Sequence, residues 1–160
     1  MTDSLSISVR EATSADAVVL ADLYEIGRQG IENERGAEID SLLHERTGDL
    51  VTAFSDDLRD QDVRIFVGLV DSVLVGYVVV RLVEPREGTT LAIVNDLFVL
   101  PGARGVGVGR ALLDVVVEVS RAAGSIGLSA RALPGDRATK NFFESFGLVA
   151  RSIDVHVDLR

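Results

Sequence analysis

The chain has 160 residues, of which 47% are hydrophobic and 26% charged, and its net charge is −9. This length and composition suit one folded domain spanning residues 1–160 and exclude a largely disordered chain. The longest apolar run, residues 73–80, is too short to cross a membrane, and the polar, acidic first residues are not typical of a secretory leader. We therefore expect a cytoplasmic protein.

The absence of cysteine excludes disulfides, thiolate metal sites and a cysteine nucleophile. No other metal-binding spacing occurs, so the sequence predicts no metal site. The negative charge argues against nucleic-acid binding, which needs clustered basic residues. Acidic residues are concentrated between Glu32 and Asp62, where ten Asp or Glu accompany three Arg. This segment is either a solvated helical face or a wall that binds a cation.

The first third of the chain predicts a strand and then helices. Residues 5–10 alternate apolar and polar side chains, which is the period of a half-buried strand. Residues 13–16 offer N-cap candidates for the helix that follows, and residues 27–36 predict a loop. Apolar residues then recur at helical spacing over residues 39–58, a segment that Gly48 can divide into two helices.

From residue 63 the period changes to that of strands. Residues 64–70 and 73–83 predict a hairpin about Asp71 and Ser72, and residues 91–99 predict a third strand. After it we expect a helix over 105–123, a strand over 126–131, a helix over 137–146 and a closing strand over 149–159. This order predicts an α/β (α+β) fold, with one mixed, mostly antiparallel sheet, a parallel β-α-β crossover and helices on both faces.

The residues suited to chemistry gather where the strand over 91–99 enters a glycine-rich turn at the start of a helix. The turn reads Arg104-Gly105-Val106-Gly107-Val108-Gly109-Arg110. Free N–H groups and the helix dipole favour phosphate oxygens there, and glycine leaves room for them. A Walker A loop fails at Gly107-Val108, and the dinucleotide-binding pattern fails at Arg110. The pattern Arg-x-x-Gly-x-Gly fits Arg104, Gly107 and Gly109.

On these residues the sequence resembles the GNAT superfamily of N-acetyltransferases. The match to its acyl-CoA motif comprises Asn95-Asp96-Leu97-Phe98-Val99, Pro101 and the glycine-rich turn, and the helix from Asp136 to Leu148 matches a second motif in spacing. The resemblance implies that acetyl-CoA is the cosubstrate and that the strand over 91–99 splays from the parallel strand over 126–131. It also assigns the binding residues: backbone of Leu97, Phe98 and Val99 for pantetheine, and Arg104, Gly105, Val106, Gly107, Val108, Gly109 and Arg110 for the pyrophosphate.

The resemblance leaves the base of the reaction open. The position of the family's usual glutamate holds Asn95, which cannot take up a proton and is expected to orient water or substrate. Asp96 follows with opposite strand parity, so it serves as the base only if a bulge turns it; otherwise it is a structural polar residue. Glu32 and Glu34, in the loop predicted over residues 27–36, are alternative candidates for the base.

The second departure from the family concerns the acid. The tyrosine that protonates the departing thiolate aligns with Phe143, which keeps the ring but has no hydroxyl. Ser145 is a substitute donor, and Tyr24 and Tyr77 are predicted in the core or on a helix surface. Asp136 replaces the asparagine that contacts pantetheine, and it can equally cap a helix.

The sequence therefore predicts an acetyl-CoA-dependent N-acetyltransferase that acts on a primary amine, either in a small molecule or at a lysine or amino terminus of a protein. The acidic segment favours a cationic acceptor, and the absence of cysteine favours direct attack in a ternary complex. Because of Phe143 and Asn95, the alternative is a catalytically weak acyl-CoA-binding sensor or partner-binding module. We expect a monomer or a homodimer, since a closing strand such as 149–159 often pairs across dimers in this superfamily.

Overall fold

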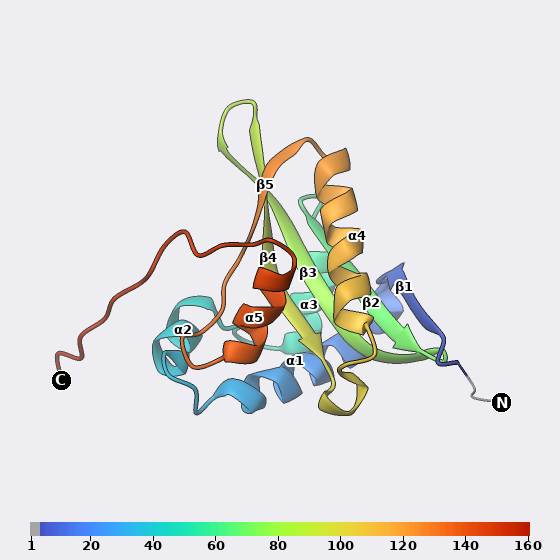
Figure 1. The fold of residues 1–160 in the computed structure, drawn as a ribbon, viewed down its shortest axis with the longest axis horizontal. Helices are drawn as coiled ribbons and strands as arrows, with labels where there is room; N and C mark the ends of the chain where they lie inside the picture. Colours follow the sequence, from blue (N-terminus) through green and yellow to red (C-terminus); the bar gives the residue numbers. More distant parts are fainter. Residues whose placement is uncertain (1–3) are drawn as a thin grey trace.

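In the computed structural model, which describes residues 4–160, five strands form one mixed sheet in the order β1-β2-β3-β4-β5 (Figure 1). The strands span Ile7–Glu11 (β1), Val63–Val70 (β2), Val73–Arg86 (β3), Thr89–Val99 (β4) and Ser125–Ala130 (β5). Neighbouring strands are antiparallel except β4 and β5, which are parallel and are joined through a helix. The predicted mixed, mostly antiparallel sheet with its crossover is confirmed.

Helices cover both faces of this sheet. They span Ala17–Ile31 (α1), Ala37–His44 (α2), Leu50–Arg59 (α3), Val108–Ala122 (α4) and Arg137–Ser145 (α5), with short 3-10 helices at Ser14–Asp16 and Pro101–Ala103. Side chains of α1 and α3 pack on one face, and those of α4 and α5 pack on the other. No helix within residues 4–160 has both the length and the hydropathy to cross a membrane.

The central strand β3 is buried on both faces. Tyr77 and Val79 face α1 and α3, whereas Val78 and Val80 face α4, and all four are at most 1% exposed. A strand covered from both sides is apolar at every position, and residues 75–80, which make up most of the longest apolar run of the sequence, are all buried.

Two glycines of the helical region have different roles. Gly48 has φ +75 and separates α2 from α3, as predicted. The loop expected from residue 27 is wrong at its beginning, because α1 continues to Ile31. A Cβ on Gly27 would lie 3.0 Å from the Phe98 ring, so this glycine lets α1 pack closely on the sheet. That packing offsets the cost of about 1 kcal/mol for glycine inside a helix.

The strand predicted over residues 149–159 is not formed. This segment pairs with no strand of the described chain and runs clear of the sheet (Figure 1), although Arg160 at its end binds Glu38 of α2 at 2.9 Å, so β5 is an edge of the sheet. Ile153, Val155 and Leu159 are 86%, 92% and 91% exposed. Alternating apolar residues stabilise a strand only when it has a neighbouring strand and a surface to cover, and the sequence pattern does not supply either.

Candidate functional site

A β-bulge in β4 sets the direction of the Asp96 side chain. Val79 pairs with Asp96 but the next residue, Val80, pairs with Val94, so Asn95 is the additional residue of β4. Without the bulge, Val94 and Asp96 would face the same side of the sheet. With it, Val94 packs in the core under α4, whereas Asp96 turns to the opposite face. The condition on which a catalytic role for Asp96 depended is therefore met.

Beyond this bulge β4 and β5 separate. Their parallel pairing ends at Val94 with Ala130, while β4 continues to Val99 and pairs there with β3 alone. The edge of residues 95–99 that faces away from β3 therefore has no strand neighbour. Leu97, Phe98 and Val99 all border the resulting opening, which is the arrangement that the family resemblance implied.

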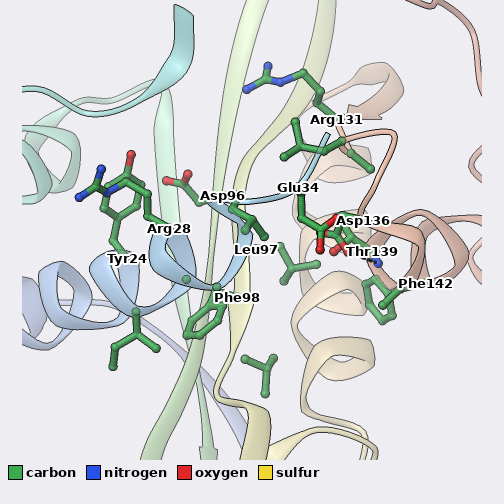
Figure 2. Close-up of a pocket in the computed structure, with 18 of the residues that line it drawn as sticks. Tyr24, Arg28, Glu34, Asp96, Leu97, Phe98, Arg131, Asp136, Thr139 and Phe142 are labelled. Atoms are coloured by element: carbon green, nitrogen blue, oxygen red, sulfur yellow. Dashed lines mark hydrogen bonds between the residues drawn. The ribbon is translucent and has the colours of Figure 1, made fainter. Parts of the chain in front are cut away.

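A cavity of about 940 Å³ extends from this opening, between the glycine-rich turn and the loop that joins α1 to α2. Figure 2 shows Tyr24 and Asp96 on one side of Leu97 and Phe98, and Asp136 and Phe142 on the other. The volume of the cavity is in the range of small-molecule sites, about 300–1,000 Å³. The cavity therefore connects the predicted cosubstrate site with a second compartment beside α1 and α2.

The glycine-rich turn at one end of the cavity is open to an anion. Gly105 and Gly107 have φ +80 and +105, in the left-handed region that favours glycine, and a Cβ on Gly105 would meet no atom within 4 Å. Helix α4 begins after Gly107 with no side-chain cap, so its first N–H groups are free. Arg104 and Arg110 also line the cavity. This donor set fits the diphosphate of acetyl-CoA.

Arg104 is attached to the end of β4. Its Nε donates to the Val99 carbonyl oxygen at 2.8 Å, and its guanidinium lies 5.6 Å from the centre of the Phe98 ring. Arg110 lies over the Phe146 ring at 4.6 Å. Arg104 is thus positioned by β4, and Arg110 by the residue that follows α5.

Three of the predicted cosubstrate residues do not line the cavity with their side chains. Val108 and Phe143 are buried in the core at 1% and 7% exposure, and Val106 points outward from the turn. Val106 and Val108, which the resemblance assigned to the pyrophosphate, can therefore contact it only through their backbone N–H groups. On α5 it is Phe142, not Phe143, that lines the cavity.

The other residues considered on α5 have local partners. Asp136 lines the cavity and also caps α5, because its Oδ1 accepts from the Thr139 N–H at 3.1 Å. Both predicted roles of Asp136 are therefore compatible with its position. The Ser145 hydroxyl donates to the Phe142 carbonyl oxygen at 2.6 Å and does not line the cavity, which leaves it no place as a proton donor.

Asp96 lies in a partly buried polar cluster that the sequence did not indicate. Its Oδ2 accepts from Arg46 Nη2 at 2.7 Å, and Arg46 Nη1 donates to Asp57 Oδ2 at 2.6 Å. The backbone N–H of Arg46 donates to the Tyr24 hydroxyl at 2.8 Å. Burial raises the pKa of the Asp96 carboxyl above its ordinary value, although the Arg46 cation acts in the opposite direction. Arg46 is 50 residues from Asp96 in the chain, and no motif links the two.

The compartment beside α1 and α2 has an acidic wall. Its carboxylates come from the acidic segment of the sequence: Glu32, Glu34, Glu38, Asp40 and Glu45. Glu45 is paired with Arg28 at 2.7 Å and Asp40 with Arg131 at 2.8 Å. Glu32 and Glu34 form no ion pair within residues 4–160. Part of the acidic segment therefore lines the cavity and is not only a solvated helical face.

Two loops meet across the cavity at glycines. Gly36 of the α1–α2 loop lies against Pro134 of the β5–α5 loop, where a Cβ would be 3.3 Å from Pro134 Cδ. Gly135 lies against Glu34 and Arg35, and a Cβ there would be 2.9 Å from the Arg35 backbone nitrogen. The contact places Glu34 beside Asp136 and Thr139 (Figure 2). No group of three metal-ligating side chains is found in the described part of the chain.

Comparison with protein families shows that residues 30–148 match the acetyltransferase (GNAT) family. Comparison with curated proteins gives no match. Among solved structures, a tetramutant of the BH1408 protein from Bacillus halodurans is 18% identical, with TM-score 0.78 over 95% of this chain and 99% of that one. A ribosomal-protein-alanine N-acetyltransferase from Brucella melitensis is 21% identical (TM-score 0.72, 96% and 99%). An aminoglycoside N-acetyltransferase in complex with CoA is 13% identical (TM-score 0.73, 100% and 99%). These structures share the fold.

Proposed function

Because the chain belongs to the acetyltransferase (GNAT) family, we propose that it transfers the acetyl group of acetyl-CoA to a primary amine. The observation that carries this proposal is one cavity that joins an open glycine-rich turn to an acidic compartment. Acetyl-CoA supplies a thioester, which is reactive enough toward an amine to need no metal or further activation. The chain contains no cysteine that could carry an acyl group, which favours direct transfer to the amine in a ternary complex.

The turn and the splayed strand are proposed to hold the cosubstrate. Gly105 and Gly107 expose N–H groups to the diphosphate, and Arg104 and Arg110 add positive charge beside them. The free edge of β4 over residues 97–99 can bind an extended ligand as an added strand would be bound. An N–H group of this edge is also a suitable donor to the oxyanion of the transition state.

Asp96 is proposed to accept the proton of the acceptor amine, directly or through a water that Asn95 orients. An alkyl ammonium has a pKa of about 10.4 and is almost fully protonated at neutral pH, so a base is required. Burial raises the pKa of Asp96 above its ordinary value, and a carboxylate with a raised pKa is a better proton acceptor than an exposed aspartate. Tyr24, on α1, lines the same cavity, and its hydroxyl, which accepts from the Arg46 N–H, still has its own proton to donate.

The acceptor is proposed to be cationic. Glu32 and Glu34 are carboxylates without an ion-pair partner in residues 4–160, and they attract an ammonium group to the cavity. The names of two structural neighbours refer to acceptors that carry amino groups, a ribosomal protein alanine and an aminoglycoside. The acidic wall agrees with acceptors of this chemistry.

Calorimetric titration with acetyl-CoA, followed by a thiol-release assay with a panel of amines, tests the function. We expect binding, and release of CoA with cationic amines. The variant Gly105→Trp fills the turn, and we expect about 100-fold weaker binding because two charged hydrogen bonds of about 1.5 kcal/mol each are lost.

The matched control is Gly88→Trp. Gly88 has φ +75, close to the φ +80 of Gly105, and a Cβ there also meets nothing within 4 Å, but it lies in the β3–β4 turn at the far end of the sheet (Figure 1). Both variants therefore carry the same backbone strain, and only Gly105→Trp is expected to lose acetyl-CoA. Absence of binding by the unmodified protein contradicts the proposal. Binding without turnover of any amine favours the acyl-CoA sensor instead.

A further inference from the structure

We propose that Arg46 is a positioning residue for acetyl transfer, which fixes the Asp96 carboxylate at the cavity and keeps it an anion. Arg46 itself does not line the main cavity, and it belongs to the loop between α2 and α3. The inference rests on the proposed function, in which Asp96 accepts the proton of the amine.

The guanidinium of Arg46 binds two carboxylates with its two terminal nitrogens. Nη2 lies 2.7 Å from Asp96 Oδ2, and Nη1 lies 2.6 Å from Asp57 Oδ2. The three side chains are only 14%, 20% and 16% exposed for Arg46, Asp96 and Asp57. A planar guanidinium shared between two partly buried carboxylates has little freedom to rotate, so it fixes the position of Asp96.

Aromatic rings hold the guanidinium from the side. Its carbon lies 4.2 Å from the centre of the Phe54 ring and 5.6 Å from that of Tyr24. Phe54 belongs to α3 and is fully buried in the core that α1 and α3 form with the sheet. A lysine at this position would keep the charge but could neither stack in this way nor reach both carboxylates, so the site depends on arginine.

Only one oxygen of Asp96 is used by this contact. Oδ2 accepts from Arg46, whereas Oδ1 has no hydrogen bond within residues 4–160, and Asp96 borders the cavity. Arg46 therefore binds Oδ2 and leaves Oδ1 available. Oδ1 can accept the ammonium proton, either directly or through a water that relays this proton.

Several charged or titratable groups face Asp96 from the surrounding elements. They are Tyr24 on α1, Arg46 in the α2–α3 loop, Asp57 on α3, Tyr77 on β3 and Arg131 after β5. Burial raises the pKa of Asp96. The cations of Arg46 and Arg131 lower this pKa, and the Asp57 anion raises it. Removal of the Arg46 cation must therefore raise the pKa of Asp96 further, whereas removal of the Asp57 anion must lower it.

These opposite signs define the experiment. The titration of the Asp96 carboxyl is followed by carbon-13 NMR of the protein without acetyl-CoA or amine, with Asp96→Asn to assign the signal. In Arg46→Gln we expect the midpoint to move up by about one pH unit or more, and in Asp57→Asn we expect it to move down. Arg46→Lys keeps the charge without the fork, so it should move the midpoint less than Arg46→Gln does.

The same variants are then compared in the transfer reaction. The acid limb of kcat/KM should follow the Asp96 midpoint in each variant, while the Kd for acetyl-CoA stays unchanged because Arg46 does not contact the glycine-rich turn.

Thermal melting shows which variants are folded. If Arg46→Gln is not folded, the midpoints of Arg46→Lys and Asp57→Asn test the inference in its place. A midpoint that does not move, or that moves in the same direction in the arginine and Asp57 variants, overturns the inference. If the unmodified protein does not transfer an acetyl group, the proposed function is overturned instead. The two failures are distinguishable because the NMR titration needs no substrate.

Discussion

Phe142 and Phe143 are adjacent in α5 but have different surroundings. Phe143 is 7% exposed and packs in the core with residues of α4 and the sheet. Phe142 lines the cavity and is the ring of α5 that a ligand would meet. The position that aligns with the family's tyrosine is therefore a core position in this chain, and the neighbouring position faces the site.

A tyrosine at each position should have a different effect. Phe143→Tyr places a hydroxyl in the core, and we expect a loss of about 1–3 kcal/mol in the free energy of unfolding without a higher rate. Phe142→Tyr places the hydroxyl in the cavity, where a general acid for the leaving thiolate should increase kcat. Denaturant unfolding and thiol release measure the two effects. A higher kcat with unchanged stability in Phe143→Tyr would show that the aligned position, and not Phe142, reaches the thiolate.

At the scale of elements, the bulge in β4 and the contact between two loops shape the cavity. The bulge turns Asp96 away from the α4 face, and the α1–α2 loop brings Glu34 to the β5–α5 loop. The sequence indicated both loops but not their contact, because the contact joins segments that the sheet brings together from distant parts of the chain.

The contact between the α1–α2 loop and the β5–α5 loop predicts what a methyl group on Gly135 would do to acceptor binding. In Gly135→Ala the new Cβ would lie 2.9 Å from the Arg35 backbone nitrogen, which is too close, so the loops must move apart and carry Glu34 with them. We expect the KM of a cationic amine to rise about tenfold, equivalent to about 1.4 kcal/mol, with little change in acetyl-CoA affinity. Gly127→Ala is the control, since its Cβ meets only Leu91 at an ordinary 3.4 Å. Equal KM values in the two variants would show that the contact does not position the acceptor.

At the scale of the whole molecule, the charge of −9 is unevenly distributed. Arg104 and Arg110 line the cavity at the glycine-rich turn, whereas Glu32 and Glu34, which form no ion pair within residues 4–160, line it at the α1–α2 loop. Charges of opposite sign on two different segments suit an anionic cosubstrate and a cationic acceptor in one cavity. The overall charge adds a weaker attraction for cations that salt screens.

A matched pair of charge changes tests this separation. Glu34→Gln removes a carboxylate from the cavity, and Glu118→Gln removes one from the exposed surface of α4, so both change the net charge by the same amount. We expect the KM of a doubly charged amine to rise about three- to tenfold in Glu34→Gln at low salt and much less in Glu118→Gln. Steady-state kinetics at low and high salt measure the difference, which should shrink as salt increases. Equal effects of the two variants would assign the attraction to net charge alone.

The sequence by itself determined the features that depend on short stretches of chain. Strand and helix periods, the break at Gly48 and the arginine-flanked glycine turn are set by neighbouring residues. Except for the strand over residues 149–159 and the beginning of the loop at residue 27, they are found where the sequence places them. These were sufficient to predict the mixed sheet and to identify the family, and the family resemblance in turn implied the separation of β4 from β5.

The tertiary structure alone decided the features that depend on pairing across the chain. The direction of Asp96 depends on the bulged register of β3 and β4, and its partner Arg46 arrives from a loop 50 residues away. Residues 149–159 have the period of a strand, yet they form none, since a strand needs a neighbour and a surface to cover. A local pattern states which side chains prefer burial, whereas only the packed fold determines what they are buried against.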